Sequence, residues 1–580
     1  MAISVSGIVP VAHLPLILGV LRKLEVAALI DDLLPPHPDN VISCGRGVEA
    51  LVLAILDGDH ALYKVGVRLE ERGMLPLLQE GLKRESVNDY RLGLILETLF
   101  AANLNRVFGA LALKALEVYS LETAWLHQDT TTLSLYGAYE AIEAGREIAA
   151  NESDAPVVPR PAYGHSKDHR PDLKQVVLSL GVSGAGGLPL RMGIRDGHTS
   201  DSTEMPVAIE ECLALGLEGM VGIVADSKAY SRRTLGLCME QSIGLVTLVP
   251  RTCGVRQELE AWGQQHAPLP LLVEKPGRTQ GDAPRRWWGQ SVARVVDVEY
   301  ADGRTAQETM RFLVVSSSQL AEQQARAYAT AQAKEAEQVA EHIRRVAARS
   351  FACAADAEAA IAQEEGCGQG QRGRKPRRWR YHALHYRVEA FTHRQKRTRR
   401  GRPAKTEPPQ EETRYRLVVK AEEWPQVAQE QGWTVLATTV GTAGCSDEQI
   451  LRAYQEQNST VEPGLRWIKN PAAITPMWLE KPERIAALAM LTVVGLLVYG
   501  LMQHQVRLYL QEHEQHLPGN KGLTDTPTAA VVMSLFTPVM MVQIQVDKMV
   551  VRQVYGWQDH HGRVCDALGI DRSWYEAHPT

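Results

Sequence analysis

The sequence of 580 residues predicts an α/β fold in which helices flank a mixed sheet. Residues 1–122 carry apolar side chains at helical spacing, most clearly over 14–34 and 47–56, and predict an N-terminal helical domain. Residues 123–250 alternate short β-branched runs with helical stretches in the order β-β-β-α-β-α-β. This alternation is typical of a domain built around one sheet.

The composition is that of a globular protein, with 45% hydrophobic and 23% charged residues. The net charge of −5 excludes a polycation, so a nucleic-acid surface has to come from local clusters of Lys and Arg. The 8 cysteines are scattered without a Cys-x2-Cys pair, and the N-terminus has no signal-peptide pattern. We therefore expect free thiols and a cytoplasmic protein.

Three acidic residues stand out by their position in predicted elements. Asp129 lies in the middle of the predicted strand 124–133, where Asp is depleted unless it faces water or has a role. Asp226 ends a short apolar run, at the carboxyl tip of a strand, where α/β folds place their chemistry. Glu462 lies in a predicted helix for which Ser446 offers an N-cap. The three acids are candidate catalytic residues.

In this order the acids resemble those of the DDE transposases of insertion sequences, and within that family the group with an insertion domain before the Glu. The stretches that carry the resemblance are Gln128-Asp129-Thr130-Thr131, the segment 163–175, Ala225-Asp226-Ser227, the segment 461–471 around Glu462, and 481–485. The resemblance covers most of the chain and implies a ribonuclease H-like catalytic core. A gap of 236 residues between Asp226 and Glu462, against 97 between Asp129 and Asp226, leaves room for a large insertion.

The resemblance implies five parts of the chain. An N-terminal helical domain for DNA-end binding or dimerisation covers 1–122, and the first part of the catalytic core covers 123–250. The insertion covers 251–430, and the second part of the core, with the Glu helix, covers 431–515. A C-terminal tail available for a dimer contact covers 516–580. We expect the N-terminal domain to act either through a helix-turn-helix or as a helical scaffold.

The implied activity is Mg²⁺-dependent hydrolysis at the ends of a mobile element, followed by transfer of the 3′-hydroxyl into target DNA. Two Mg²⁺ roughly 3.5–4 Å apart would activate the attacking and leaving oxygens, and Mn²⁺ is expected to substitute. By the resemblance Asp129 bridges both ions, and Asp226 and Glu462 complete the two sites. The implied partners are the terminal inverted repeats and target DNA, bound by a homodimer in a synaptic complex of a prokaryotic, nucleoid-associated enzyme.

Around Glu462 the sequence follows the family's Tyr-x2-Arg-x3-Glu-x6-Lys pattern only in part. Lys469 keeps the Glu-x6-Lys spacing, and we expect it to contact a phosphate near the cut. The Tyr and Arg positions hold Gln455 and Asn458, which weakens the case for a hairpin mechanism. Arg466 lies one helical turn after the Glu, on the same face, and is a further candidate DNA contact.

Two other groups of cations are candidate DNA contacts. Lys167 and Arg170 lie in the loop 165–170, which either touches the DNA backbone or is solvated. The segment 371–405 holds 14 Lys or Arg against one Glu, a net of +13. Within it Arg400-Gly401-Arg402-Pro403 resembles an AT-hook core, in which Arg400 and Arg402 would enter the minor groove. A charged loop without a ligand is the alternative.

The apolar run 485–502 is at the lower length limit for a membrane span, and we expect a core helix and no membrane partner. Two other functions stay open beside transposition. One is a different ribonuclease H-like nuclease. The other is a catalytically inactive or domesticated copy that only binds DNA.

Overall fold

The computed structural model describes residues 3–34, 41–121, 123–137, 139, 156–184, 186–277, 281–364, 379–394, 411–423, 432–469, 479–546 and 549–576. The chain forms two compact units, the first with Met1–Gln257, Gln290–Leu313 and Val435–Thr580 and the second with Glu258–Gly289 and Val314–Thr434. Residues 290–313, expected in the insertion, thus belong to the first unit. The other domain boundaries stay predictions.

The first unit begins with a helical part, as the apolar spacing predicts. Its helices are α1 (Leu14–Lys23), α2 (Val26–Leu33), α3 (Cys44–Leu56), α4 (Leu62–Glu71), α5 (Leu75–Leu78), α6 (Asp89–Ala101) and α7 (Leu104–Tyr119). Ser43 caps α3 and Asn88 caps α6, because each side chain accepts a backbone N–H of the first helical turn. One part of the expectation is wrong, since residues 3–9 form a strand.

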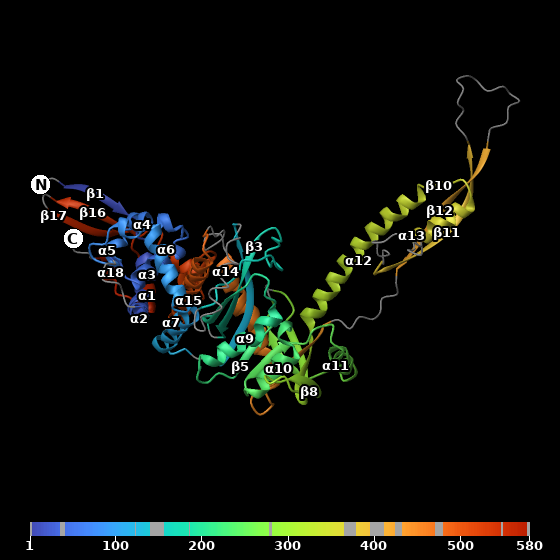
Figure 1. Cartoon of the computed structure of the whole chain (residues 1–580), viewed down its shortest axis with the longest axis horizontal. Helices are drawn as coiled ribbons and strands as arrows, with labels where there is room; N and C mark the ends of the chain where they lie inside the picture. The colour runs from blue at the N-terminus through green and yellow to red at the C-terminus, as the bar shows by residue number, and fades with distance from the viewer. Residues whose placement is uncertain are drawn as a thin grey trace, which may run out of the picture. The chain divides into compact units, whose positions relative to one another are not determined.

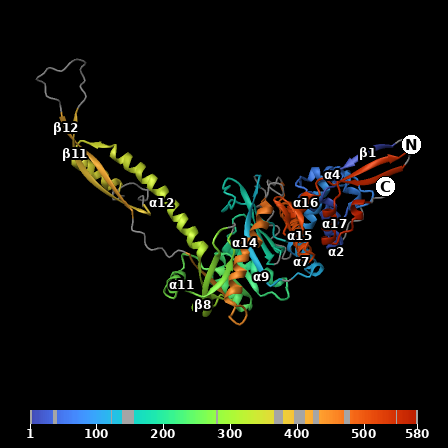
Figure 2. The ribbon, with the colours of Figure 1, turned by 180° about the vertical axis from the view of Figure 1, so that it is seen from behind.

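That strand, β1 (Ile3–Val9), is held by the other end of the chain. It pairs antiparallel with β16 (Met540–Val546), which also pairs with β17 (Met549–Tyr555). Figures 1 and 2 show both termini beside this sheet. The remaining C-terminal elements are β14 (Leu517–Gly519), β15 (Gly522–Thr524), α16 (Ala529–Leu535), α17 (Asp559–Leu568) and α18 (Ser573–Glu576). The dimer contact expected of this tail stays a prediction.

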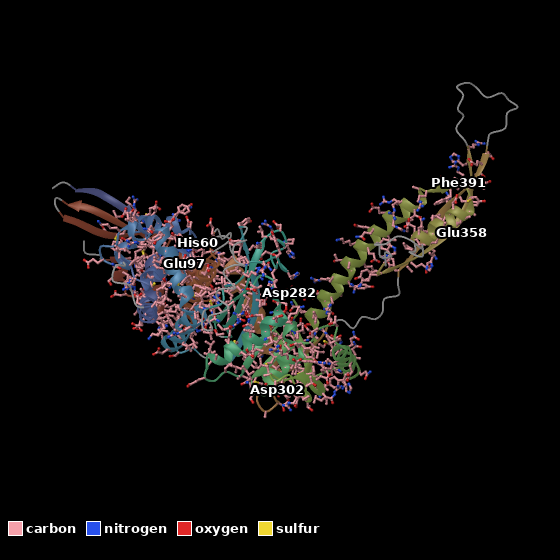
Figure 3. The ribbon with its side chains drawn as sticks, viewed as in Figure 1. His60, Glu97, Asp282, Asp302, Glu358 and Phe391 are labelled. Atoms are coloured by element: carbon pink, nitrogen blue, oxygen red, sulfur yellow. The ribbon has the colours of Figure 1, made fainter. Side chains whose placement is uncertain are left out.

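The apolar run lies in α15 (Pro482–Glu512), which packs against α3, α6 and α7 (Figure 1). Among the described residues α15 is long and apolar enough to cross a membrane, yet 94% of its apolar window is buried inside the protein. Its first turn is fastened to α6, because Glu97, labelled in Figure 3, accepts hydrogen bonds from Lys481 at 2.7 Å and Arg484 at 2.8 Å. These contacts are those of a core helix.

A large mixed sheet follows the helical part. Its strands are β2 (Trp125–Leu135), β3 (Lys174–Ser183), β4 (Pro189–Arg195), β5 (Gly222–Ala225), β6 (Gly244–Leu248), β8 (Arg285–Glu299), β9 (Thr305–Ser317) and β13 (Trp433–Thr438). Within the first unit their order is β4-β3-β2-β5-β6-β13-β9-β8. The strands β2, β3 and β4 are antiparallel, whereas β2, β5 and β6 run parallel.

The helices beside this sheet include α9 (Asp201–Ala214), α10 (Arg232–Glu240) and α14 (Asp447–Lys469). The helix α14 packs against β2, β3, β5 and β6, and α9 packs against β3 and β4. The predicted order β-β-β-α-β-α-β is confirmed, as β2, β3, β4, α9, β5, α10 and β6. The predicted α/β class, a mixed sheet flanked by helices, is confirmed as well.

The second unit has its own small core. Its elements include β7 (Leu271–Lys275), α12 (Ser318–Ala347), β10 (Ser350–Phe351), α13 (Ala354–Glu364), β11 (His382–Arg394) and β12 (Glu411–Glu423). Val346, Ala357 and Leu417 are buried where the two helices meet the β11–β12 hairpin. On the hairpin the Arg416 guanidinium lies 5.5 Å from the ring centre of Phe391, which is labelled in Figure 3.

Candidate active site

The sheet brings Asp129 and Asp226 together. The parallel register of β2 and β5 pairs Gln128 with Ala225; Asp129 is the next residue of β2, and Asp226 directly follows the last residue of β5. Because parallel strands advance together, the two carboxylates leave the sheet at the same level. The two acids therefore form one site, although they stand 97 residues apart in the sequence.

Burial, together with neighbouring carboxylates, raises the pKa of both carboxyl groups. For Asp129 burial is the largest cause, and the charges of Asp226 and Asp201 raise the pKa further, whereas Lys167 lowers it. Burial also leads for Asp226, and Asp201 again adds to the rise. Each carboxylate is oriented by the backbone, since Asp129 accepts the N–H of Thr130 at 2.7 Å and Asp226 accepts the N–H of Lys228 at 2.9 Å. A positive charge beside the carboxylates offsets this repulsion, as the charge of Lys167 does for both.

A third acid at this site, Asp201, was not predicted. It is the first residue of α9, directly after the N-cap Ser200, and its Oδ1 accepts the hydroxyl of Thr130 at 2.5 Å. Acids are common in the first turn of any helix, so the position of Asp201 in the sequence does not by itself indicate a role. An available signal was that this helix directly follows the strand β4, which lies in the same sheet as β2.

Lys167 lies between these acids. Its Nζ stands 3.7 Å from a carboxylate oxygen of Asp129 and 3.7 Å from one of Asp201. It also donates to the carbonyl and the hydroxyl of Thr130, at 2.8 and 2.7 Å. The DNA contact proposed for Lys167 is untested, but in this structure its charge is held by carboxylates. Arg170, from the same loop, pairs with Asp172 at 2.8 Å and donates to the hydroxyl of Tyr136.

Glu462 lies on α14, which crosses β2 and β5, and the Pro463 that follows it is accommodated inside the helix. Its carboxylate pairs with Arg466 at 2.9 Å, and the two side chains are 51% and 80% exposed. Within the described ranges no three His, Cys, Asp or Glu side chains lie close enough to hold a metal ion together. The structure thus brings two of the three predicted acids together, with Glu462 on the neighbouring helix.

Other residues of α14 connect this helix to the site. The pKa of Tyr454 is raised to about 12, first by burial and then by the charge of Asp226. Tyr454 is one residue away from the family's Tyr position, so an aromatic ring reaches the site from a shifted place. Lys469 forms an ion pair with Asp168, which also accepts the Ser134 hydroxyl at 3.4 Å. Arg400 and Arg402 lie outside the described residues.

A balanced group of charges holds α9 in place beside the acids. The side chain of Arg191 is 3% exposed and pairs with Glu204, 1% exposed, at 2.8 Å. Arg195 pairs with the same Glu204 at 2.7 Å and with Glu211 at 2.7 Å. Arg191 also donates to Gln128 at 3.3 Å, one residue before Asp129. The first turn of α9, with Asp201, is thereby fixed relative to β2.

Comparisons with known proteins add little to this geometry. Residues 6–113 match a family model described as a domain of unknown function (DUF4277). No curated protein matches the chain. Among solved structures, the cryo-EM structure of a piggyBac transposase synaptic complex with hairpin DNA is similar at 8% sequence identity and a TM-score of 0.35, covering 90% of this chain and 79% of that chain. A likeness of this degree carries no functional argument, so any functional proposal has to rest on the chain's own residues.

Proposed function

We propose that this chain is a DDE transposase, a metal-dependent nuclease that hydrolyses a phosphodiester at the ends of a mobile element and joins the freed 3′-hydroxyl to target DNA. The observation that carries the proposal is the adjacency of Asp129 and Asp226 at the level where the parallel strands β2 and β5 end their pairing. The order β4-β3-β2-β5-β6 with its first three strands antiparallel supports the ribonuclease H-like core that the sequence resemblance implies.

The donor chemistry of the site fits Mg²⁺. This ion prefers oxygen ligands and keeps several waters, so a few carboxylates suffice to bind it. Asp129 and Asp226 would hold it with Glu462, whose carboxylate would exchange Arg466 for metal, and Asp201 offers further oxygen beside them. When bound, two Mg²⁺ would supply the charge that activates the attacking oxygen and stabilises the leaving oxygen.

The protein's own part in this reaction is to orient and to exclude water. The backbone N–H groups of Thr130 and Lys228 hold the two Asp carboxylates at fixed angles. The half-buried side chain of Tyr454 lies near enough to Asp226 to interact electrostatically with it, and would keep water from that side of the carboxylate. Lys469 lies on the same helical face as Glu462, where it would bind a phosphate next to the cut once it leaves Asp168.

The test is cleavage and joining of a labelled duplex that carries the terminal inverted repeats of the element, in Mg²⁺. We expect Asp129→Asn, Asp226→Asn and Glu462→Gln each to lower both rates at least about 100-fold while DNA binding is kept. The matched control is Glu448→Gln. Glu448 is on the same helix and pairs with Arg452 four residues later, at 48% exposure, much as Glu462 pairs with Arg466. This variant should act as wild type.

Three results would decide against parts of the proposal. Wild-type protein that binds the ends specifically without nicking them favours the inactive DNA-binding copy. Nicking without joining favours another ribonuclease H-like nuclease. Full activity in Glu462→Gln, with the two Asp variants dead, removes Glu462 from the site and points to Asp201 as the remaining acid.

A further inference from the structure

The Lys167 ammonium has the surroundings of a bound cation. It lies near four oxygens, namely the carbonyl and hydroxyl of Thr130 at 2.8 and 2.7 Å and one carboxylate oxygen each of Asp129 and Asp201 at 3.7 Å. Carboxylate, hydroxyl and backbone carbonyl oxygens are also the ligands that Mg²⁺, Mn²⁺ and Ca²⁺ take from proteins. We call this set, from Thr130, Asp129 and Asp201, the oxygen cage.

The charges around the oxygen cage explain why it holds a cation. Asp129, Asp201 and Asp226 interact electrostatically with one another, and each carboxylate disfavours charge on its neighbours. One ammonium therefore relieves repulsion that metal would otherwise relieve. An ammonium and a divalent ion within a few Å repel each other strongly, so both cannot occupy the same oxygens.

We propose that Lys167 is a resident counter-cation of the metal-free site, which has to leave the oxygen cage before a divalent metal binds Asp129. The proposal rests on the proposed function, because it takes metal binding at Asp129 as given. Lys167 is then not a permanent structural ion pair, and it is held away from DNA as long as the site is without metal. It is a competitor of the metal that keeps the empty site neutralised.

Asp168, the residue next to Lys167, connects the displacement of Lys167 to DNA binding. Asp168 pairs with Lys469 of α14, and the backbone N–H of Lys167 donates to the hydroxyl of Thr132 at 3.1 Å. Two cations that the sequence predicts to contact DNA are thus held by carboxylates: Lys167 by Asp129 and Asp201, and Lys469 by Asp168, the residue next to Lys167 in the loop. Withdrawal of this loop when metal enters would free both for phosphates, so metal should strengthen DNA binding.

The test is titration of full-length protein with Mn²⁺ by calorimetry, together with thermal unfolding in EDTA. Lys167→Met removes the charge and keeps the side-chain length. We expect it to bind Mn²⁺ about tenfold more tightly than wild type, while its Tm in EDTA falls. Replacing a lysine with only a structural role would lower both the Mn²⁺ affinity and the Tm. A rise in Mn²⁺ affinity together with a fall in Tm therefore identifies a counter-cation. The control is Lys521→Met, the same change in the exposed turn between β14 and β15, which should leave both unchanged.

Two further variants keep the outcome decisive. Lys167→Arg retains the charge and should keep Mn²⁺ affinity within about twofold of wild type. This variant also provides a test if Lys167→Met does not fold. Asp129→Asn should lose Mn²⁺ binding. If wild type and Asp129→Asn titrate alike, metal does not bind at Asp129 and the proposed function fails there. If binding needs Asp129 but Lys167→Met binds no tighter than wild type, the counter-cation alone is overturned.

Discussion

Two clusters of charged side chains lie next to each other along β2 and differ in their numbers of cations and carboxylates. Around Gln128 the cluster contains two cations and two carboxylates: Arg191, Arg195, Glu204 and Glu211. Around Asp129 it contains three carboxylates and the ammonium of Lys167, with the charge of Lys228 acting on Asp226. Both use the helix α9, which supplies Glu204 and Glu211 to one cluster and Asp201 to the other.

The difference separates a buried cluster with balanced charges from an accessible acidic cluster, at which we propose that metal binds. In the balanced cluster Arg191 and Glu204 are almost fully buried and satisfy each other. In the acidic cluster Asp129, Asp201 and Lys167 are 29%, 26% and 32% exposed, so a ligand can reach them. Uncompensated carboxylates that remain accessible are a ready site for cations, whereas paired buried charges are costly to change and bind nothing.

The largest expected effect breaks the balanced cluster. Arg191→Met leaves Glu204 buried with one partner fewer, and removal of one partner from a buried pair costs about 3–5 kcal/mol. Urea unfolding, followed by tryptophan fluorescence, measures the loss in free energy of unfolding. Arg195→Met is the comparison, because this side chain is 21% exposed and leaves Arg191 in place, so its loss should be about half or less. Equal losses would mean that burial does not distinguish the two arginines.

A second, intermediate effect concerns the pH dependence of the acidic cluster. Burial first, then the other acids, holds the pKa of Asp129 above its ordinary value in the folded protein. The folded state therefore binds this proton more tightly than the unfolded state. The resulting stability is fully present below the ordinary Asp pKa of about 3.9 and is lost as pH rises through the raised pKa.

Asp129→Asn lacks this loss. In EDTA the Tm of the variant should exceed that of wild type by a margin that grows as pH rises from about 4 toward neutrality. Scanning calorimetry at several pH values measures the margin. Asp297→Asn, which changes a surface partner of Arg232, is the control and should show no such growth. A margin that shrinks with pH would mean that Lys167 outweighs burial in setting the charge of Asp129.

The smallest expected effect concerns the exposed pair on α14. Arg466→Ala removes an i,i+4 partner of Glu462 at 80% exposure, so the loss in free energy of unfolding should stay within about 0.5 kcal/mol. The matched variant Arg452→Ala removes the equivalent partner of Glu448. If Arg466 contacts DNA, end binding in a filter assay falls for Arg466→Ala and not for Arg452→Ala. Equal binding by both removes Arg466 from the DNA surface.

Much of the site was readable along the chain because it depends on local signals. Asp129 in a strand and Asp226 at a strand end are visible as polar breaks in apolar runs. Ser446, expected to cap the Glu462 helix, does accept the backbone N–H of Gln449 at 3.2 Å. These features need only hydrogen bonds and periodicity within about ten residues, which short stretches of sequence encode directly.

Other features depend on partners far away in the chain. Asp201 joins the acids because β4 and α9 return to β2, and Lys167 joins them because a loop folds over the same strand end. The strand β1 forms because it pairs with β16, which lies near the other end of the sequence. The residues next to such a side chain in the sequence do not indicate which distant residues it will contact.

By itself the sequence determined the α/β class, the order of strands and helices in the core, and the placement of Asp129 in one strand and of Asp226 at the end of another, since hydrophobic periodicity and chain order are local properties. The tertiary structure alone decided which cation faces those acids, that a third carboxylate stands beside them, and that residues 290–313 belong to the first unit. The physical reason is that sheet register and helix packing set distances between segments, and electrostatic interactions depend on those distances.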